Sequence, residues 1–245
     1  MTQKKTVRQF NRDVEVNIGY LYTTAAKLSS RLANLRLSEA VEHITNLAGK
    51  RVIDVGCGDG TYTLELLTAR PRYVLGVDAA EAAVNCAKQK SVGFDHIEFR
   101  MMDIYDLDSL GERFDVAVVR GMLHHLYDAK KAITILSKIA KEVIFIEPNG
   151  CNLILKIIEK TSRYHIEHEE KSYSPRQLDR WFAQNGGRLI RSFYCGLVPF
   201  FCPDRVSRML KMLEPIVERI PFLRQLVCAV YVSKVSFNQM DCRDN

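Results

Sequence analysis

The sequence predicts an α/β domain with a mostly parallel β-sheet covered by helices on both faces. Short apolar runs of strand length alternate with segments of helical periodicity, which is typical of βαβ units. The chain has 245 residues, of which 47% are hydrophobic and 26% charged. That is enough for one domain with a sizeable core and an ordinary surface.

Seven apolar runs predict the strands. Five occur in the first part of the chain, and two near its end predict closing strands. Their residue ranges are 51–55, 73–77, 96–100, 114–119 and 143–147, then 188–194 and 227–235.

Two helices have clear sequence signals. Residues 128–141 carry one apolar stripe with a period of 3.6 residues. A second helix is expected to begin after Ser174, which has the features of an N-cap, with Pro175 in the first position and Gln177 completing a capping box. Gly186 and Gly187 predict its end.

Residues 13–47 are helical in pattern and contain two apolar stripes. The simpler interpretation is two helices packed on the sheet. The alternative is a lid that places Tyr20 and Tyr22 over a ligand. The stripes consist of Val14, Ile18, Leu21, Ala25, Leu28, Leu32 and Leu35, followed by Leu37, Val41, Ile44 and Leu47.

The stretch RVIDVGCGDG (51–60) places a glycine loop directly after the first strand. Its glycines are Gly56, Gly58 and Gly60. This G-x-G-x-G spacing differs from the G-x-G-x-x-G of dinucleotide sites. Asp54 and Asp59 would disfavour a pyrophosphate at short range. A positively charged ligand without phosphate, such as S-adenosylmethionine, fits better.

Two further acids follow the second and third strands. Asp78 ends the second strand, where a carboxylate can accept hydrogen bonds from both ribose hydroxyls. Asp103 follows the third strand, where it can accept the adenine amino group while Met102 or Ile104 covers the ring. Each acid alone is more often a solvated surface residue, but all three acids at successive strand ends favour a ligand site.

Four segments resemble the ordered motifs of class I S-adenosylmethionine-dependent methyltransferases. They are VIDVGCGDGTYTLELL, LGVDAAEAAV, FRMMDIYDL and FDVAVVRGMLHHLYDAKKAI. The LHHL most resembles the small-molecule branch that contains the quinone-biosynthesis methyltransferases. The resemblance implies an enzyme with a Rossmann-like sheet of seven strands, the last antiparallel, and S-adenosylmethionine across strands one, two and four.

The residues expected at the cofactor follow from these motifs. They are Asp54, Gly56, Cys57, Gly58, Gly60, Asp78, Ala79, Met102, Asp103, Ile104 and Arg120, with Tyr22 from the N-terminal segment.

His124 and His125 follow the fourth strand, where the loop is expected to face the transferred methyl group. Methyl transfer depends largely on positioning, and a base is needed only if the acceptor must lose a proton. Either histidine is a candidate catalytic base. The alternative is that it packs against the neighbouring helix and shapes the pocket.

The acceptor is narrowed by motifs that are missing. The residues after the fourth strand, 120–123, are Arg-Gly-Met-Leu rather than the [DNS]-P-P-[YFW] of enzymes that methylate amino groups of nucleic-acid bases. They include neither a cysteine nucleophile nor an acid for a metal, and the chain has no basic-aromatic stripe for nucleic acid. A small-molecule substrate remains, with no nucleic-acid partner and no metal.

Residues 148–173 form an insertion expected to cap the substrate. Its polar cluster supplies candidate substrate-binding residues, together with Tyr20 from the N-terminal segment; they are Tyr164, His165, His168 and Glu169. The H-x-x-H-E pattern lacks the helical spacing of a zinc site. A solvated charge run is the competing interpretation.

A second insertion, residues 199–224, carries an apolar stripe that Pro215 is expected to kink or break. Packing on its own domain or on a second subunit is the favoured interpretation, and an anionic membrane surface is the alternative, with Arg205, Arg208 and Lys211 off the stripe. The preceding apolar segment GLVPFFCP could line a hydrophobic pocket, so a hydrophobic methyl acceptor remains an alternative. The stripe consists of Val206, Met209, Leu210, Leu213, Ile216, Val217 and Ile220.

We therefore expect a single domain. Its parts are N-terminal helices (1–48), a cofactor-binding core (49–147), the substrate cap (148–173) and the C-terminal half of the sheet (174–245). The sequence lacks a signal peptide and an apolar run long enough to span a bilayer, so a cytoplasmic enzyme without stable membrane insertion is expected. A net charge of +6 selects no partner, and the oligomeric state stays open. A non-catalytic scaffold is the alternative function, and an RNA or protein methyltransferase is less favoured.

Overall fold

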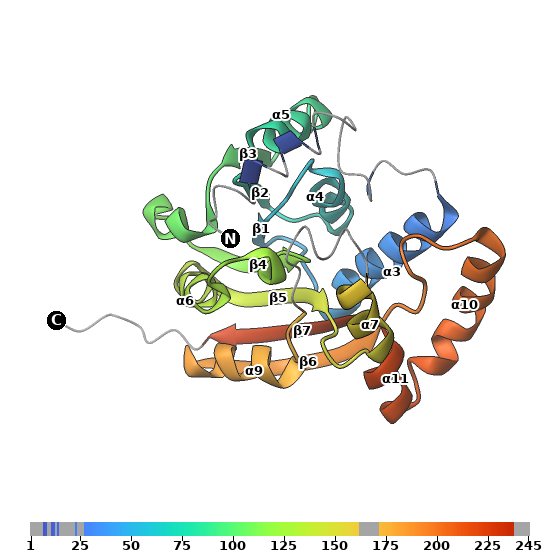
Figure 1. Cartoon of the computed structure of the whole chain (residues 1–245). Coiled ribbons are helices and arrows are strands. Elements are labelled where there is room, and N and C mark those ends of the chain that lie inside the picture. The colour runs from blue at the N-terminus through green and yellow to red at the C-terminus, as the bar shows by residue number, and fades with distance from the viewer. Residues whose placement is uncertain are drawn as a thin grey trace.

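A computed structural model describes residues 7–8, 11–12, 14, 23, 27–161 and 172–237. Within them, one sheet has seven strands in the order β3-β2-β1-β4-β5-β7-β6 (Figure 1). The pairs among β1 to β5 are parallel, and β7 runs antiparallel to both of its neighbours, β5 and β6. The expected fold class is confirmed.

Every predicted apolar run contains or overlaps a strand. The strands are β1 (Arg51–Val55), β2 (Tyr73–Asp78), β3 (Ile97–Met101), β4 (Phe114–Arg120), β5 (Ala140–Pro148), β6 (Gly187–Cys195) and β7 (Val230–Phe237). The middle strands β1, β4 and β5 are buried along most of their length, because helices cover both faces of a parallel sheet.

The helices alternate with the strands as expected. They are α3 (Leu28–Ile44), α4 (Thr61–Glu65), η1 (Leu66–Ala69), α5 (Glu81–Lys90), η2 (Ile104–Leu110), η3 (Leu123–His125), α6 (Ala129–Ile139), α7 (Leu153–Thr161), α9 (Pro175–Gln184), α10 (Asp204–Val217) and α11 (Pro221–Val227). The start of α9 confirms its sequence signal, because the Ser174 hydroxyl accepts a hydrogen bond from the Gln177 amide. Asp128 caps α6 in the same way through the Lys131 amide.

The sheet has a hydrophobic core on each face. On one face α6 and α9 cover the inner strands, and the rings of Phe145 and Phe182 stack with centroids 4.7 Å apart. On the other face α3 packs against β1, β4 and β5 through Ala40, Val41 and Ile44. Strand side chains alternate between the two faces, so each strand contributes to both cores.

The N-terminal helices differ from the sequence interpretation. One continuous helix, α3, contains the end of the first predicted stripe from Leu28 to Leu35 and most of the second, so the two stripes do not correspond to two separate helices here. Leu35 is 52% exposed, whereas Leu37 and Val41 are buried on the sheet. The helix propensities of its residues show no break inside α3. Which of its apolar residues are buried depends on how the helix packs against the sheet.

The insertion between β6 and β7 also differs. The helix α10 continues through Pro215 to Val217, so Pro215 does not end it, and α11 follows as a separate helix. The buried side chains of α10 are Ser207 and Glu214, so the expectation that its apolar stripe packs on its own domain is wrong, whereas packing on a second subunit stays a prediction. Among the described residues, no helix is both long and apolar enough to cross a membrane.

Candidate active site

The glycine loop lies at the carboxyl edge of the sheet, between β1 and α4. Gly56, Gly58 and Gly60 have φ angles of +79°, +54° and +75°, which glycine adopts without the steric cost of a Cβ. A Cβ on Gly56 would lie 2.6 Å from the sulfur of Met122, in the loop after β4. The loop therefore requires glycine for both its backbone angles and its close approach to the fourth strand.

Asp78 connects the end of β2 to this loop. Its carboxylate accepts hydrogen bonds from the Gly58 amide at 3.0 Å and from the Ala80 amide at 2.8 Å. Burial raises the pKa of Asp78, the amides of the loop lower it, and Asp103 raises it further. Each carboxylate oxygen has a second acceptor position, so these contacts are compatible with hydrogen bonds from a ligand.

The end of β3 brings Asp103 to the same edge. Its Oδ1 accepts a hydrogen bond from the Tyr105 amide at 3.1 Å and caps η2. Met102 is partly exposed, and its amide donates to the Asp78 carbonyl. Ile104 is only 4% exposed and belongs to the core. Met102 therefore offers more surface to a ligand than Ile104 does.

Asp54 is buried behind the glycine loop. The Thr63 hydroxyl donates to its carboxylate at 2.5 Å, which joins β1 to α4. Burial raises the pKa of Asp54 to about 6, although Thr63 and the charge of Arg120 oppose this shift.

The charge of Asp59 is balanced within the protein. This residue is 2% exposed, with Lys90 at 3.0 Å and the Thr23 hydroxyl at 2.8 Å. Burial favours a higher pKa, but Lys90 and Thr23 hold the pKa of Asp59 below its ordinary value. Asp59 is therefore paired within the protein, and the contact of Asp54 with the cofactor stays a prediction.

Cys57 and Arg120 connect the glycine loop and the end of β4 to neighbouring helices and strands. Cys57 is 8% exposed and packs with Ala87 and Phe99, and burial raises the pKa of its thiol. The guanidinium of Arg120 stacks 3.7 Å from the ring centroid of Tyr62 and donates to Asn34 and Ser38 of α3. Ala79 is partly exposed beside Asp78.

His124 forms a pair with Glu147, which the sequence interpretation missed. His124 Nδ1 lies 2.8 Å from Glu147 Oε2, and Glu147 is 1% exposed at the end of β5. The same carboxylate accepts hydrogen bonds from the Met122, Leu123 and His124 amides. The sequence contains one signal for this pair: an acidic residue at the end of the fifth strand, which lies beside the fourth strand and the histidines that follow it. The rings of His124 and His125 lie 3.9 Å apart.

Parts of the N-terminal segment lie against this edge. Besides Thr23 on Asp59, Asn11 accepts a hydrogen bond from the Ala82 amide at 2.9 Å, and Val14 packs on Ala80 and Ala83. The remaining candidates lie outside the described residues, and their placement stays a prediction. They are Tyr20, Tyr22, Tyr164, His165, His168 and Glu169.

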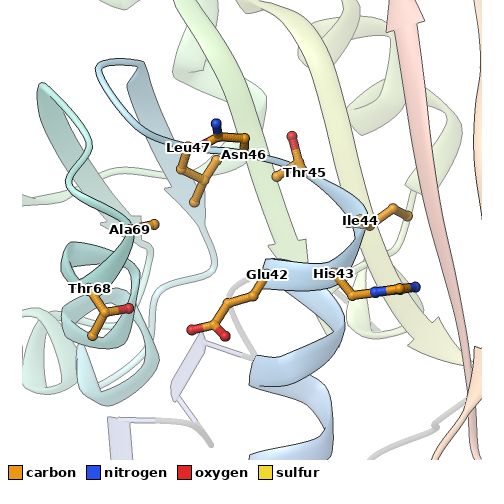
Figure 2. A pocket seen from close by; sticks show the side chains of 8 residues that line it. All are labelled: Glu42, His43, Ile44, Thr45, Asn46, Leu47, Thr68 and Ala69. Carbon is orange, nitrogen blue, oxygen red and sulfur yellow. The ribbon is translucent and has the colours of Figure 1, made fainter.

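A hollow of about 600 Å³ lies elsewhere, where α3 leads into β1 (Figure 2). There Glu42 points toward the helical turn of Thr68, and His43 points away from it. This is the amino edge of the parallel strands, opposite the glycine loop, so the hollow is separate from the candidate site.

Comparisons with known proteins agree with this geometry. Residues 46–186 match a protein-family model described as a methyltransferase domain. The ubiquinone biosynthesis O-methyltransferase of Alkalilimnicola ehrlichii is 28% identical over 175 residues, covering 64% of this chain and 68% of that protein. The corresponding protein of Acinetobacter baylyi is 32% identical over 151 residues, covering 54% and 62%.

A solved structure shares the fold over nearly the whole chain. It is the magnesium protoporphyrin IX methyltransferase of Synechocystis PCC 6803 with bound S-adenosylmethionine, with a TM-score of 0.65 at 17% identity and coverage of 97% and 98%. The residues at this edge fit the same cofactor, because the Asp78 carboxylate beside the Gly58 amide can accept further hydrogen bonds from hydroxyl groups. The chain belongs to the methyltransferase-domain family and is a class I S-adenosylmethionine-dependent methyltransferase.

Proposed function

We propose that this enzyme methylates a hydroxyl group of a small molecule and that His124 is the catalytic base. The observation that carries the proposal is the 2.8 Å contact between His124 Nδ1 and Glu147 at the ends of β4 and β5. The names of two relatives, O-methyltransferases of ubiquinone biosynthesis, support oxygen as the acceptor atom and a hydroxylated quinone precursor as the substrate class.

The pair suits proton removal. When the Nδ1–H group of His124 donates a hydrogen bond to Glu147, the neutral imidazole carries its acceptor lone pair on Nε2. A hydroxyl placed against Nε2 passes its proton there as the oxygen attacks the methyl group. The buried carboxylate then stabilises the imidazolium and keeps the ring in one orientation. We assign His125, whose ring lies at a tilt of 42° against this ring, to the wall of the pocket.

The cofactor supplies an activated methyl group on a sulfonium. We propose that the glycine loop approaches it through its backbone, that Asp78 accepts the ribose hydroxyls, and that Asp103 and Met102 hold the adenine. Their places at the ends of β1, β2 and β3 support this assignment. The polar cluster of residues 164–169 and Tyr20 remain the proposed contacts to the acceptor.

The test compares His124→Gln with the matched variant His125→Gln. Methyl-labelled cofactor is offered with a panel of phenols, alcohols, amines and thiols, including phenols with and without an isoprenoid chain. We expect product on hydroxyl compounds. His124→Gln should lower kcat by about 10²–10⁴-fold with the cofactor Kd unchanged, and His125→Gln should have a much smaller effect.

Glu147→Gln provides a second readout. Loss of the carboxylate destabilises the imidazolium, so the acid limb of the rate–pH profile should move to lower pH. A purely structural Glu147 would lower the melting temperature without moving this limb. An unchanged rate in His124→Gln would contradict the base assignment, and products formed only on amines or carbon would contradict the acceptor.

A further inference from the structure

The helix α10 presents its apolar stripe away from the protein. Val206, Met209, Leu213 and Ile216 are 39%, 54%, 43% and 58% exposed, and Met212 is 79% exposed. An apolar stripe of a helix normally faces the core. The helix α10 therefore has the opposite orientation, with its apolar side toward solvent and its polar side toward the protein.

Polar contacts on the inner face fix this orientation. Glu214 is 2% exposed and accepts a hydrogen bond from the Leu197 amide. Glu218 binds the Gly196 amide and forms a two-point ion pair with Arg36 of α3. In Figure 1, α10 lies beside α3 at the edge of the molecule. A rotation that buried the apolar stripe would break these buried polar contacts, which is costly.

The helix α11, which follows α10 in the chain, also carries exposed apolar side chains. Together with those of α10 they form the set that we call the α10–α11 face, made of Val206, Met209, Met212, Leu213, Ile216, Ile220 and Phe222. Phe222 on α11 is 73% exposed. The neighbouring helix α7 adds Leu153 and Ile154, which are 61% and 57% exposed. Large apolar side chains exposed in such numbers on neighbouring helices are typical of an interaction site.

The Asn149 and Asn152 side chains fix α11 beside α7. They donate to the carbonyls of Gln225, Val227 and Cys228 at the end of α11. The apolar side chains of the two helices therefore belong to a surface that side-chain hydrogen bonds hold in place.

The charges around the face are mostly positive. Within residues 199–228, all of which the structure describes, Arg205, Arg208 and Arg219 are exposed. The exposed carboxylate in this range is Asp204, because Glu214 is buried and Glu218 is largely covered by its pairing with Arg36. An apolar surface with basic residues complements an anionic lipid bilayer.

We propose that the α10–α11 face docks the enzyme on an anionic lipid bilayer. The apolar side chains enter the boundary between headgroups and acyl chains, and the arginines reach the lipid phosphates with their long side chains. A second copy of the chain fits less well, because a symmetric contact would bring the same arginines together. The face adjoins α7, which follows β5, the strand that carries Glu147.

The first experiment measures flotation of the intact protein with vesicles and needs no activity, so it is independent of the proposed function. Vesicles of phosphatidylcholine alone are compared with vesicles containing one third phosphatidylglycerol. Met212→Asp/Phe222→Asp should lower the binding constant by about tenfold or more. The matched control is Val92→Asp/Phe94→Asp, which adds the same charge at apolar residues that are 81% and 53% exposed between α5 and β3.

The second experiment tests the charges. Arg205→Gln/Arg208→Gln/Arg219→Gln should weaken binding to anionic vesicles by about tenfold or more. Its matched control neutralises three exposed basic residues elsewhere, Arg113, Lys138 and Arg188, which should change binding far less. Equal binding to neutral vesicles, or equal loss in both sets, would overturn the proposal.

The oligomeric state shows whether a second copy of the chain, rather than a lipid bilayer, covers the α10–α11 face. Light scattering of the parent protein and of Met212→Asp/Phe222→Asp should show the same mass. A dimer that this variant dissociates, without vesicle binding by the parent, would identify the face as a subunit interface and overturn the lipid assignment. Failure of the parent protein to bind anionic vesicles would do the same.

Discussion

Acids of the same type have different surroundings at the carboxyl edge of the sheet. Asp78 lies beside the glycine loop, Asp54 is buried behind it, and Asp59 is paired with Lys90. Sequence position could predict Asp78, since the last residue of a parallel strand lies at the ligand edge. It could not predict the pairing of Asp59, because Lys90 ends α5, which follows α4, η1 and β2 in sequence.

Replacing Asp78 tests the ribose assignment. Asp78→Ala should weaken S-adenosylmethionine binding by at least about tenfold, because loss of a hydrogen bond to a charged group costs about 1.5–3 kcal/mol. Calorimetry gives the dissociation constant. Asp108→Ala, at an exposed acid in η2, is the matched control and should bind normally. An equal Kd in both variants would refute the assignment.

Replacing Asp54 tests a stability effect that depends on pH. Its pKa is raised to about 6 in the folded protein, so its stabilising contribution is fully present below the unfolded pKa and is lost as pH rises through the folded one. Asp54→Asn does not ionise and can still accept the Thr63 hydrogen bond. It should raise the free energy of unfolding at neutral pH by at most about 3 kcal/mol.

Urea unfolding of both proteins at about pH 4.5 and about pH 7.5 checks the Asp54 prediction. The gain should be clearly larger at the higher pH. A gain that does not depend on pH would show that ionisation of Asp54 is not its cause.

At the scale of elements, the turn from β1 into α4 depends on close packing as well as on backbone angles. Gly60 has a φ of +75°, and a Cβ there would lie 2.7 Å from the Ala87 Cβ in α5. Gly49 has a similar φ of +70° with nothing within 4 Å of its Cβ position. Substitutions at these two glycines therefore distinguish the cost of backbone strain from the cost of a steric clash.

The corresponding variants are Gly60→Ala and Gly49→Ala. Both incur the cost of the left-handed conformation, roughly 1 kcal/mol. Gly60→Ala should lose a further 1–3 kcal/mol, roughly, because α5 must move. Chemical denaturation measures the difference. Equal losses would mean that α5 yields without cost.

Helix α10 shows what periodicity leaves undetermined. The spacing from Val206 to Ile216 correctly predicts a helix with one apolar side. It cannot say which side faces the protein, because that depends on Arg36 and on backbone amides contributed by other elements. The capping signal of α9 was local and sufficient, whereas the orientation of α10 is a tertiary property.

At the scale of the molecule, cofactor binding should stabilise the whole domain. A ligand that binds only the folded state at about one hundred times its Kd adds about 2.7 kcal/mol. For a chain of this size S-adenosylhomocysteine should raise the melting temperature by about 5–10 °C. Gly58→Val, which puts a branched side chain at φ +54°, should remove this shift. An equal shift in the variant would place the cofactor away from the loop.

The number and the directions of the strands were the most predictable features of the molecule. The strand–helix alternation of residues 51–147 predicts parallel pairs from sequence, and the resemblance supplied the antiparallel last strand. The pairing of His124 with Glu147 required the fold, because it joins adjacent strands through one buried carboxylate. Long-range polar pairing leaves no periodic pattern in a sequence.

The contacts of Asn11, Val14 and Thr23 have a kinetic consequence. These residues precede α3 and touch the glycine loop and the start of α5, beside the proposed ribose site. If the demethylated cofactor leaves by this route, each turnover must break and remake these contacts. We then expect a rapid burst of methylated product followed by a slower steady rate. Loss of the Thr23 hydroxyl in Thr23→Val should shorten the residence time of the product more than it alters the burst.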